Sequence, residues 1–494
     1  MSDPIITIES GQVRGVSKGG VSRFLGIPYA AAPVGDLRFR EPQPHPGWQD
    51  VRDGTAKGAS APYLLAPFDA LDLTPLVGKG WDKGDEYLNL NIWTPNGATD
   101  APIMVFIHGG AWTGGAAMAP VQDGTAFARD GVILISIGYR LGVDGFMPIE
   151  GVPTNLGMRD MIAALEWIQR NAAAFGGDPA NVTVFGESAG AMSVADLVVS
   201  PKAQGLFRRA IIESGHGSMT RDISVARRTT AKMAKLLGVK PTREGFASVS
   251  YDDGLQALAK AALPTGGIDL RNANGRDEAY GLSKFLPVHG DDVIPVPPLQ
   301  ALAQGAGRDV EVLIGTNSEE MNLYFVPTGV KRKIGGLLAW LALSRVEKNA
   351  GKILKAYRKG RRSAGEAMTL ALSDLVFRWP ARVYAGAHQG KTWFYEFGWR
   401  STAFNGELGA CHAVEIPFVF DTLSTGAGPR GFLGANPPQA LADYVHRVWI
   451  GFGRDGSLPW PEYTALDRQV HELEAARTRV ETDTDFPLTR FWKP

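Results

Sequence analysis

The chain has 494 residues, of which 44% are hydrophobic and 21% charged, and its 51 basic residues balance 51 acidic ones. This neutral composition is ordinary for a globular protein and gives no indication of a nucleic-acid partner. The single cysteine, Cys411, excludes an intramolecular disulfide and a cysteine-based metal site.

We expect neither a targeting segment nor a membrane span in this chain. Its first residues, MSDPIITIESG, lack the basic start and apolar stretch of a secretory signal. A membrane span needs roughly 18 apolar residues, and the best candidate, GGLLAWLAL at 335–343, is much shorter. We therefore expect a cytoplasmic protein without a membrane span.

The predicted elements indicate an α/β fold. The first 30 residues alternate short extended pieces with glycine turns, which predicts an antiparallel meander. Apolar residues between Met158 and Ile168 then recur at helical spacing, and the stretch GGDP ends this helix. Continuous apolar runs that alternate with helices predict a large, mostly parallel sheet flanked by helices. The clearest strands are 103–107, 132–137, 182–185, 210–212 and 310–314.

The pattern G-x-S-x-G, which surrounds the nucleophilic serine of many hydrolases, occurs twice. Ser17 lies in the predicted meander, where a hairpin turn explains the glycines and no helix follows. Ser188 follows the strand-like run VTVF and precedes a helix-like stretch, as in a nucleophile elbow. Larger side chains at Gly186 and Gly190 would clash where the backbone turns tightly. We therefore predict that Ser188 is the nucleophile and Ser17 is not.

A serine nucleophile needs a histidine that takes its proton and an acid that orients this histidine. In the nucleophile-elbow architecture, the acid and then the histidine follow the serine along the chain. The predicted strand 310–314 runs into GTNSEEMN, which offers Glu319 and Glu320 at the carboxyl end of the sheet. The residues alone leave the choice between these two acids open.

Four histidines follow these acids in the sequence. His388 precedes its strand and lies at the wrong end of the sheet, whereas His446 and His471 lie in helical-looking stretches. His412 follows the predicted strand TWFYEF through a loop. We therefore predict that His412 is the general base.

The negative oxygen of the tetrahedral intermediate needs backbone N–H donors. One donor should belong to Ala189, directly after the nucleophile. The others should come from the loop HGGAW, which offers His108, Gly109, Gly110 and Ala111 after a predicted strand. A simple tight turn would also suit these glycines, but their position upstream of the elbow favours an oxyanion hole.

Many collinear blocks resemble the type B carboxylesterases, the α/β-hydrolase family that includes the cholinesterases. The matching blocks include FLGIPYAAAPVGDLRFREPQP (24–44), HGGAW (108–112), the elbow region (155–190), GTNSEE (315–320) and CHAVEIPFVF (411–420). The resemblance covers nearly the whole chain. It implies an α/β-hydrolase fold in a single domain, 1–494, with cap segments near 63–84 and 321–380.

The resemblance also implies roles that spacing leaves open. It favours Glu320 over Glu319 as the triad acid, and Gly110, Ala111 and Ala189 as the oxyanion donors. It further implies that Ser214, in IIESG, supports the acid. We expect no metal or cofactor.

The predicted activity is hydrolysis of small to medium carboxylic esters through an acyl-enzyme. Small residues in HGGAW imply that esters of tertiary alcohols are also accepted, although Trp112 could fill the space. Amides, carbamates or acyl transfer remain alternatives that use the same triad, and a non-catalytic cholinesterase-like protein would typically lack a triad member. Trp81 does not match the family's choline-binding tryptophan, so acetylcholine is not expected.

Residues 331–362 form a basic segment with 11 Lys or Arg and a single acid, Glu347. One interpretation is a solvated face of cap helices. Another is a surface that steers anionic substrates or contacts an acidic surface. The residues alone do not decide between these, nor do they fix the oligomeric state.

Overall fold

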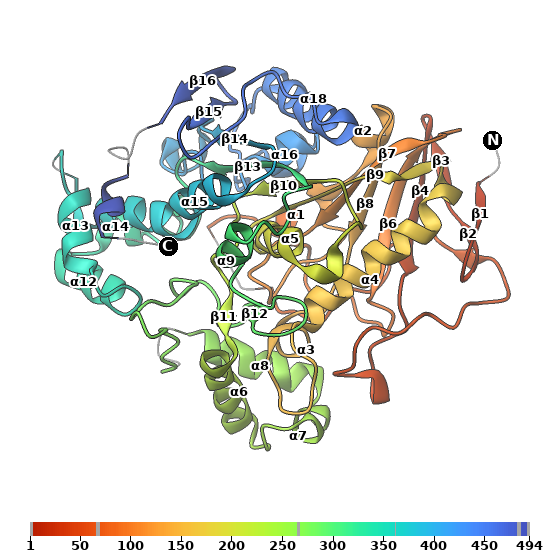
Figure 1. The fold of residues 1–494 in the computed structure, drawn as a ribbon, viewed down its shortest axis with the longest axis horizontal. Coiled ribbons are helices and arrows are strands. Elements are labelled where there is room, and N and C mark those ends of the chain that lie inside the picture. The colour runs from red at the N-terminus through yellow and green to blue at the C-terminus, as the bar shows by residue number, and fades with distance from the viewer. Residues whose placement is uncertain (1–2, 66–69, 264–266, 361, 482–485, 492–494) are drawn as a thin grey trace.

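The fold is described from a computed structural model, which covers residues 3–65, 70–263, 267–360, 362–481 and 486–491. Within these residues the central sheet has eleven strands, in the order β16-β15-β14-β13-β10-β9-β7-β8-β6-β4-β3 (Figure 1). The strands from β15 to β8 in this order pair in parallel. The strand pairs at the two ends, β16–β15 and β8–β6–β4–β3, are antiparallel. The strands are β3 Val16–Lys18, β4 Val21–Pro28, β6 Asn89–Pro95, β7 Ala101–Ile107, β8 Ile133–Ile137, β9 Gly177–Glu187, β10 Arg209–Glu213, β13 Glu311–Asn317, β14 Thr392–Phe397, β15 Gln469–Glu472 and β16 Arg477–Val480.

Helices cover both faces of this sheet, because successive strand residues point to opposite sides. Along β7, Ile103 and Val105 join one hydrophobic cluster with α4 and α5, whereas Met104 and Phe106 join a second with α16 and α18. The predicted mostly parallel sheet flanked by helices is confirmed. The helices outside the cap are α2 Thr125–Arg129, α3 Gly142–Phe146, α4 Leu156–Asn171, α5 Ala189–Val199, α6 Ile223–Leu237, α7 Arg243–Ala247, α8 Tyr251–Ala262, α9 Pro298–Ala303, α15 Trp379–Ala387, α16 Ile416–Val419, α17 Leu423–Gly426 and α18 Gln439–Asp455.

The predicted N-terminal meander is present, but it divides between two sheets. Strands β1 (Ile5–Ile8) and β2 (Gly11–Arg14) form a hairpin that continues into a short parallel pair with β5 (Arg52–Asp53). Strands β3 and β4 form a second hairpin at the edge of the central sheet. Ser17 lies in this second hairpin opposite Ser22, and its Oγ accepts a hydrogen bond from Asn96 Nδ2.

Two other local predictions meet different outcomes. The helix predicted around 158–168 is α4, which ends at Asn171 and is followed by a short 3-10 turn up to the left-handed Gly176. His471, expected in a helix, lies in β15 instead. Its stretch forms the hairpin β15–β16 because a turn around Ala476, with φ of +47°, reverses the chain.

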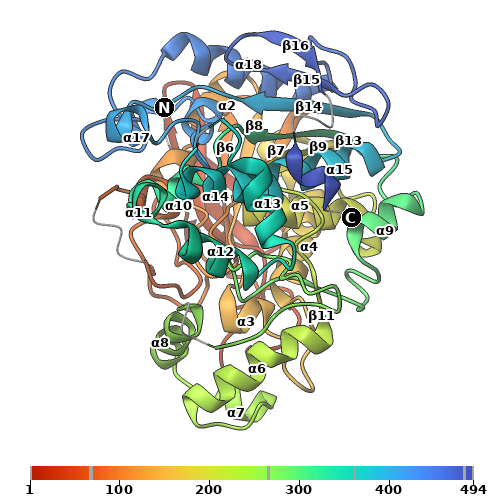
Figure 2. The ribbon, with the colours of Figure 1, turned by 90° about the vertical axis from the view of Figure 1, so that its left-hand side faces the viewer.

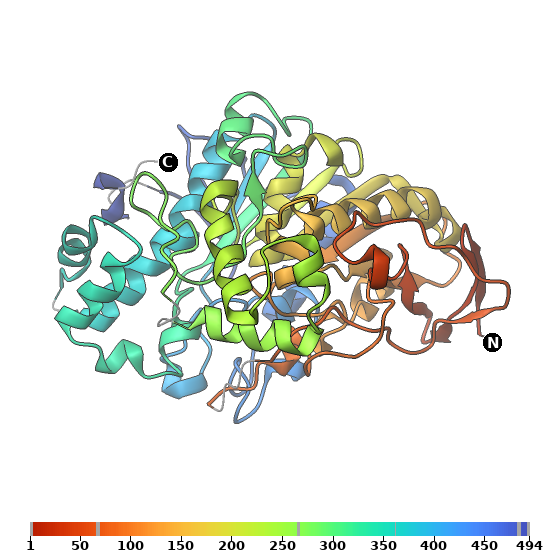
Figure 3. The same ribbon diagram turned by 90° about the horizontal axis from the view of Figure 1, so that it is seen from below.

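The two predicted cap segments lie outside the sheet. The segment 63–84 contains α1 (Thr74–Val77), and its residues 66–69 are outside the described part of the chain. The segment 321–380 forms a group of helices that Figures 2 and 3 show together at one side of the molecule. No helix in the described residues has the length and apolar character to cross a membrane. The helices of this second segment are α10 Asn322–Phe325, α11 Val330–Lys333, α12 Gly336–Ser344, α13 Ala350–Tyr357 and α14 Ala364–Ser373.

Candidate active site

Ser188 occupies a sharp turn between β9 and α5. Its φ of +56° and ψ of −124° are values that non-glycine residues rarely adopt. The neighbouring glycines make room for β7, since a Cβ atom would lie 2.0 Å from the Ile107 carbonyl oxygen at Gly190 and 2.6 Å from it at Gly186. The strand, turn and helix predicted around Ser188 are therefore present, with the glycines required by close backbone approach.

His412 links Ser188 to a carboxylate. Its Nε2 lies 2.8 Å from Ser188 Oγ, and its Nδ1 lies 2.7 Å from Glu320 Oε2. All three side chains come from loops or strand ends at the carboxyl edge of the sheet, although they are far apart in the sequence. The imidazole is nearly buried and packs near the rings of Tyr324 and Phe377, whose centroids are 5.9 Å and 4.6 Å from its own.

Glu320 is held from its other side by two donors. Ser214 Oγ and the backbone N–H of Asn317 each donate to Glu320 Oε1 at 2.7 Å. Glu319, the alternative that the sequence left open, points elsewhere and forms an ion pair with Arg400. The geometry thus brings Glu320, and not Glu319, to His412.

The other three histidines of the C-terminal part have partners away from Ser188. His388 contacts Thr392 Oγ1 and the Gly307 carbonyl. His446 Nδ1 lies 2.6 Å from the Val419 carbonyl oxygen, and His471 Nε2 lies 2.8 Å from Tyr444 Oη. These contacts are consistent with structural positions.

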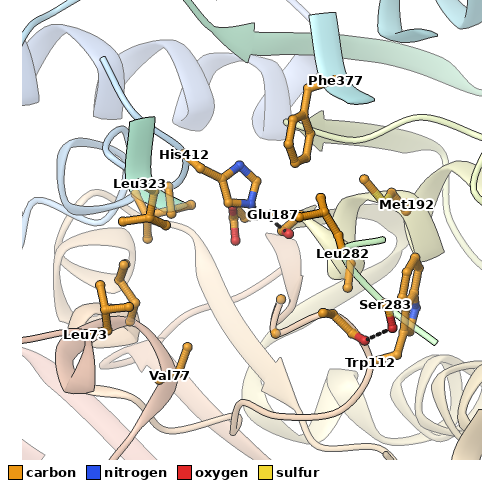
Figure 4. A pocket seen from close by; sticks show the side chains of 18 of the residues that line it. Leu73, Val77, Trp112, Glu187, Met192, Leu282, Ser283, Leu323, Phe377 and His412 are labelled. Carbon is orange, nitrogen blue, oxygen red and sulfur yellow. Dashed lines mark hydrogen bonds and ion pairs between the residues drawn. The ribbon is translucent and has the colours of Figure 1, made fainter. Parts of the chain in front are cut away.

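The loop after β7 presents backbone N–H groups beside Ser188. Gly110 has a φ of +112° and Ala111 a φ of +55°, so this loop follows a left-handed path. Ser283 Oγ donates to the Ala111 carbonyl oxygen at 2.9 Å, which holds the loop from outside (Figure 4). Within the described residues, the N–H groups of Gly110, Ala111 and Ala189 have no protein acceptor, and all three residues line the cavity over Ser188.

Glu187 is a site residue that the sequence reasoning missed. Its Oε1 lies 3.0 Å from His412 Nε2 and is buried. Burial raises the pKa of Glu187 to about 7, against the opposing effect of His412. Burial lowers the pKa of His412, but Glu187 and then Glu320 outweigh it and raise this pKa to about 9. The only available signal was its position directly before Ser188, because the last residue of a strand lies at the same edge of the sheet as the residue that follows it.

A cavity of about 230 Å³ lies over Ser188 and His412. Its walls are mainly apolar, and Figure 4 shows one group of side chains on either side of the histidine. Trp112 forms part of the wall and donates its indole N–H to Ser193 Oγ at 3.0 Å, so the ring is anchored. The labelled apolar side chains are Leu73, Val77 and Leu323 on one side, Met192, Leu282 and Trp112 on the other, and Phe377 next to the histidine.

Two further residues considered from the sequence do not line this cavity. Trp81 packs edge-on against Tyr251, at 5.8 Å between ring centroids, and does not line this cavity. Cys411 is fully buried, and its Sγ lies 3.6 Å from the His412 carbonyl oxygen. Burial raises the pKa of this thiol well above its usual value.

A model of the carboxylesterase family matches residues 2–492. The chain belongs to the carboxylesterase family. It is 35% identical to the para-nitrobenzyl esterase of Bacillus subtilis (strain 168), with 98% of this chain and 97% of that protein covered. It is 33% identical to the phenmedipham hydrolase of Pseudarthrobacter oxydans, with 94% of each covered. A solved structure of a PNB esterase matches with a TM-score of 0.84, 32% identity and 100% coverage of both chains.

These relatives confirm the resemblance read from the sequence blocks. The α/β-hydrolase fold predicted for the chain is the fold of its solved relatives. The protein is therefore a carboxylesterase, an enzyme that hydrolyses carboxylic esters.

Proposed function

We propose that this carboxylesterase uses Ser188, His412 and Glu320 as its catalytic triad. The supporting observation is that one imidazole lies within hydrogen-bond distance of both the serine hydroxyl and the carboxylate. With Nδ1–H donating to Glu320, Nε2 is the unprotonated nitrogen and accepts the Ser188 proton as Oγ attacks the ester carbonyl. His412 then protonates the leaving alcohol, and water releases the acyl group by the reverse proton transfers.

The N–H groups of Gly110, Ala111 and Ala189 are the proposed oxyanion donors. Free donors in a largely apolar cavity stabilise a developing negative oxygen strongly, because little water competes for them. Ser283 supports this arrangement, since its hydrogen bond to the Ala111 carbonyl oxygen keeps that acceptor engaged. Ser214 has a matching role at the acid, where it holds one oxygen so that the other meets His412.

Glu187 is proposed to stabilise the imidazolium that forms during each proton transfer. Its Oε1 has no hydrogen-bond donor in the described residues while Nε2 is unprotonated, and it lies 3.0 Å from that atom. Once Nε2 carries a proton, this carboxylate becomes its nearby counter-charge. The same contact makes the base harder to deprotonate, so activity should fall as the pH is lowered.

The proposed substrates are neutral, small to medium carboxylic esters. The cavity of about 230 Å³ is lined mostly by apolar side chains, and its ionisable carboxylate, Glu187, disfavours an anionic acyl chain beside the nucleophile. The backbone path through Gly110 and Ala111 also leaves room for the branched leaving group of a tertiary alcohol ester. Turnover of tert-butyl acetate, compared with a Ser188→Ala control, tests this extension.

Carbamate hydrolysis is the second candidate activity, because the phenmedipham hydrolase relative is 33% identical over nearly the whole chain. The same triad would attack a carbamate carbonyl. The hydrolysis rates of p-nitrophenyl butyrate, its matching anilide and an aryl carbamate distinguish esterase, amidase and carbamate hydrolase activity. The proposal predicts that the ester is fastest, and it is wrong if the anilide or carbamate is preferred.

We further propose that residues 1–494 act as one domain.

A further inference from the structure

The outward face of α12 has an unusual surface. Among the described residues, four of the eleven exposed large hydrophobic side chains lie within this helix of 9 residues. Leu337 is 70% exposed, Leu338 61%, Trp340 44% and Leu341 41%. A helix on the surface of a globular protein normally turns polar residues outward. This helix turns four apolar residues outward. Packing within this chain does not explain these residues, because their side chains are exposed.

Helical geometry places these four side chains together. At ~100° per residue, Leu337, Leu338, Trp340 and Leu341 fall within an arc of about 160°. Ala339 and Leu343, on the opposite arc, are the buried residues of the helix. The helix is therefore apolar on both sides, with one side against the protein and the other bare. Figure 1 shows α12 beside α13 at an outer edge of the molecule, and Figure 2 shows both on the face toward the viewer.

Cations surround this apolar face. Trp340, Lys355 and Arg358 line one surface groove of about 300 Å³ between α12 and α13. The Arg358 guanidinium also lies beside Gly336, at the start of α12. None of the exposed cations in this region has a carboxylate partner in the described part of the chain, apart from Arg332, which pairs with Glu407. The exposed cations without a carboxylate partner are Lys333, Arg345, Lys348, Lys352, Lys355, Arg358, Lys359 and Arg362.

We propose that α12 and its surrounding cations dock this carboxylesterase on the surface of a bilayer that contains anionic phospholipids. Exposed Leu and Trp side chains insert into the boundary between headgroups and acyl chains, and Lys and Arg contact the lipid phosphates. The basic composition found in residues 331–362 is thus explained by an acidic surface. This docking does not depend on the proposed catalytic roles.

Other occupants suit the observations less well. A second copy joined face to face would place one set of unpaired cations against another, which opposes association. A nucleic acid would match the charge, but its phosphodiester backbone offers nothing to four exposed apolar side chains. A lipid surface satisfies both features at once.

The docked face is also connected to the active site. Leu323 and Tyr324 of α10 line the cavity over Ser188, and α11 and α12 follow directly in the chain. Docking by α12 would therefore hold the membrane against the same chain segment that supplies part of the cavity wall.

The test is sedimentation of the full-length enzyme with vesicles. One set contains phosphatidylcholine with roughly one quarter phosphatidylserine, and the other phosphatidylcholine alone. Two variants remove the two features separately: Leu337→Ser with Leu338→Ser, and Lys352→Glu with Lys355→Glu and Arg358→Glu. A matched control reverses three exposed cations on or next to α6, by Arg227→Glu, Lys235→Glu and Lys240→Glu.

We expect the enzyme to bind the anionic vesicles and to be released by high salt. The triple reversal near α12 should weaken binding by at least about 100-fold, because each cation near an anionic surface contributes about a factor of five. The leucine variant should weaken it by at least about 10-fold. The α6 control should bind like the parent, and all variants should hydrolyse p-nitrophenyl butyrate normally, which shows that they fold.

Three outcomes would overturn the proposal. The first is equal sedimentation with both vesicle types or with neither. The second is an equal loss of binding in the α6 control, which would indicate diffuse attraction. The third is a dimer in sedimentation equilibrium that the leucine variant dissociates, with no vesicle binding, which would make a second copy the occupant.

Discussion

The candidate active site and the cap helices differ in burial and in how well their polar groups are paired. Ser188, Glu320 and His412 lie at the carboxyl edge of a buried sheet, and each has close hydrogen-bond partners. The helices α11 to α13 instead expose apolar side chains and unpaired cations. Under the two proposals, the sheet fixes the chemistry and the insertion fixes where the enzyme meets its substrate. Changes in the first region should alter turnover, whereas changes in the second should leave turnover of a dissolved ester unchanged.

The largest expected effect is at Ser188. Replacement by Ala should lower kcat/KM for p-nitrophenyl butyrate by about 10⁴-fold or more, because the hydroxyl forms the covalent intermediate. The matched control is Ser17→Ala, in the other G-x-S-x-G sequence, which should stay within about 2-fold of the parent enzyme. A folded Ser17 variant without activity would contradict the assignment.

The next effect separates two adjacent acids. Glu320→Gln should lower kcat about 10³-fold, since the amide no longer holds the imidazole in its working tautomer or stabilises its charge. Glu319→Gln loses the ion pair with Arg400 and should cost less than about 10-fold. Steady-state kinetics of both variants decides this. A more damaging Glu319 change would mean that the acid has been misassigned.

A smaller effect concerns the pH dependence set by Glu187. The Glu187 carboxylate raises the pKa of His412, whose value is about 9, and His412 must be unprotonated to act as a base. Glu187→Gln removes this charge, so the pKa of His412 falls and the acid limb of kcat/KM should move to lower pH by about one unit. Glu187→Asp keeps the charge and serves as the control. An acid limb that stays in place or moves to higher pH would exclude this role.

The smallest effect is expected at Cys411, which adjoins the base without taking part. Cys411→Ala should keep activity within about 3-fold of the parent, because within the described residues the buried thiol hydrogen-bonds to the His412 backbone carbonyl and to no side chain of the proposed triad. A bulky thiol reagent should react with the folded enzyme far more slowly than with the unfolded chain. Rapid labelling with loss of activity would show that this side of the site opens.

The fold was largely predictable because its signals are local. Apolar runs such as 103–107 and 310–314 are buried strands, and the helical spacing after Met158 is α4. His471 was misplaced because VHELEAARTRV has helix-forming residues, yet the stretch turns back as the hairpin β15–β16 and pairs with β14, which lies far away in the sequence. In this stretch, strand pairing in the folded protein outweighs the local helix propensity.

The site was only partly predictable. Ser188 and His412 follow from chain order, but the choice of Glu320 needed the family resemblance, and the structure places it by contacts with Ser214 and Asn317. Only its position next to Ser188 marks Glu187 in the sequence. Its contact with His412 forms in the folded protein, where β9 meets the loop after β14. The exposure of the apolar face of α12 could not be predicted from the sequence either, because an apolar run normally predicts a buried helix.

The central claim, that Ser188 is the nucleophile of this esterase, is tested most directly by covalent labelling. The enzyme is treated with a fluorophosphonate, and the modified peptide is identified by mass spectrometry. The account predicts one adduct per chain, on Ser188, formed in step with the loss of esterase activity and absent from the Ser188→Ala variant. An adduct on any other residue, or complete inhibition with Ser188 unmodified, would contradict it.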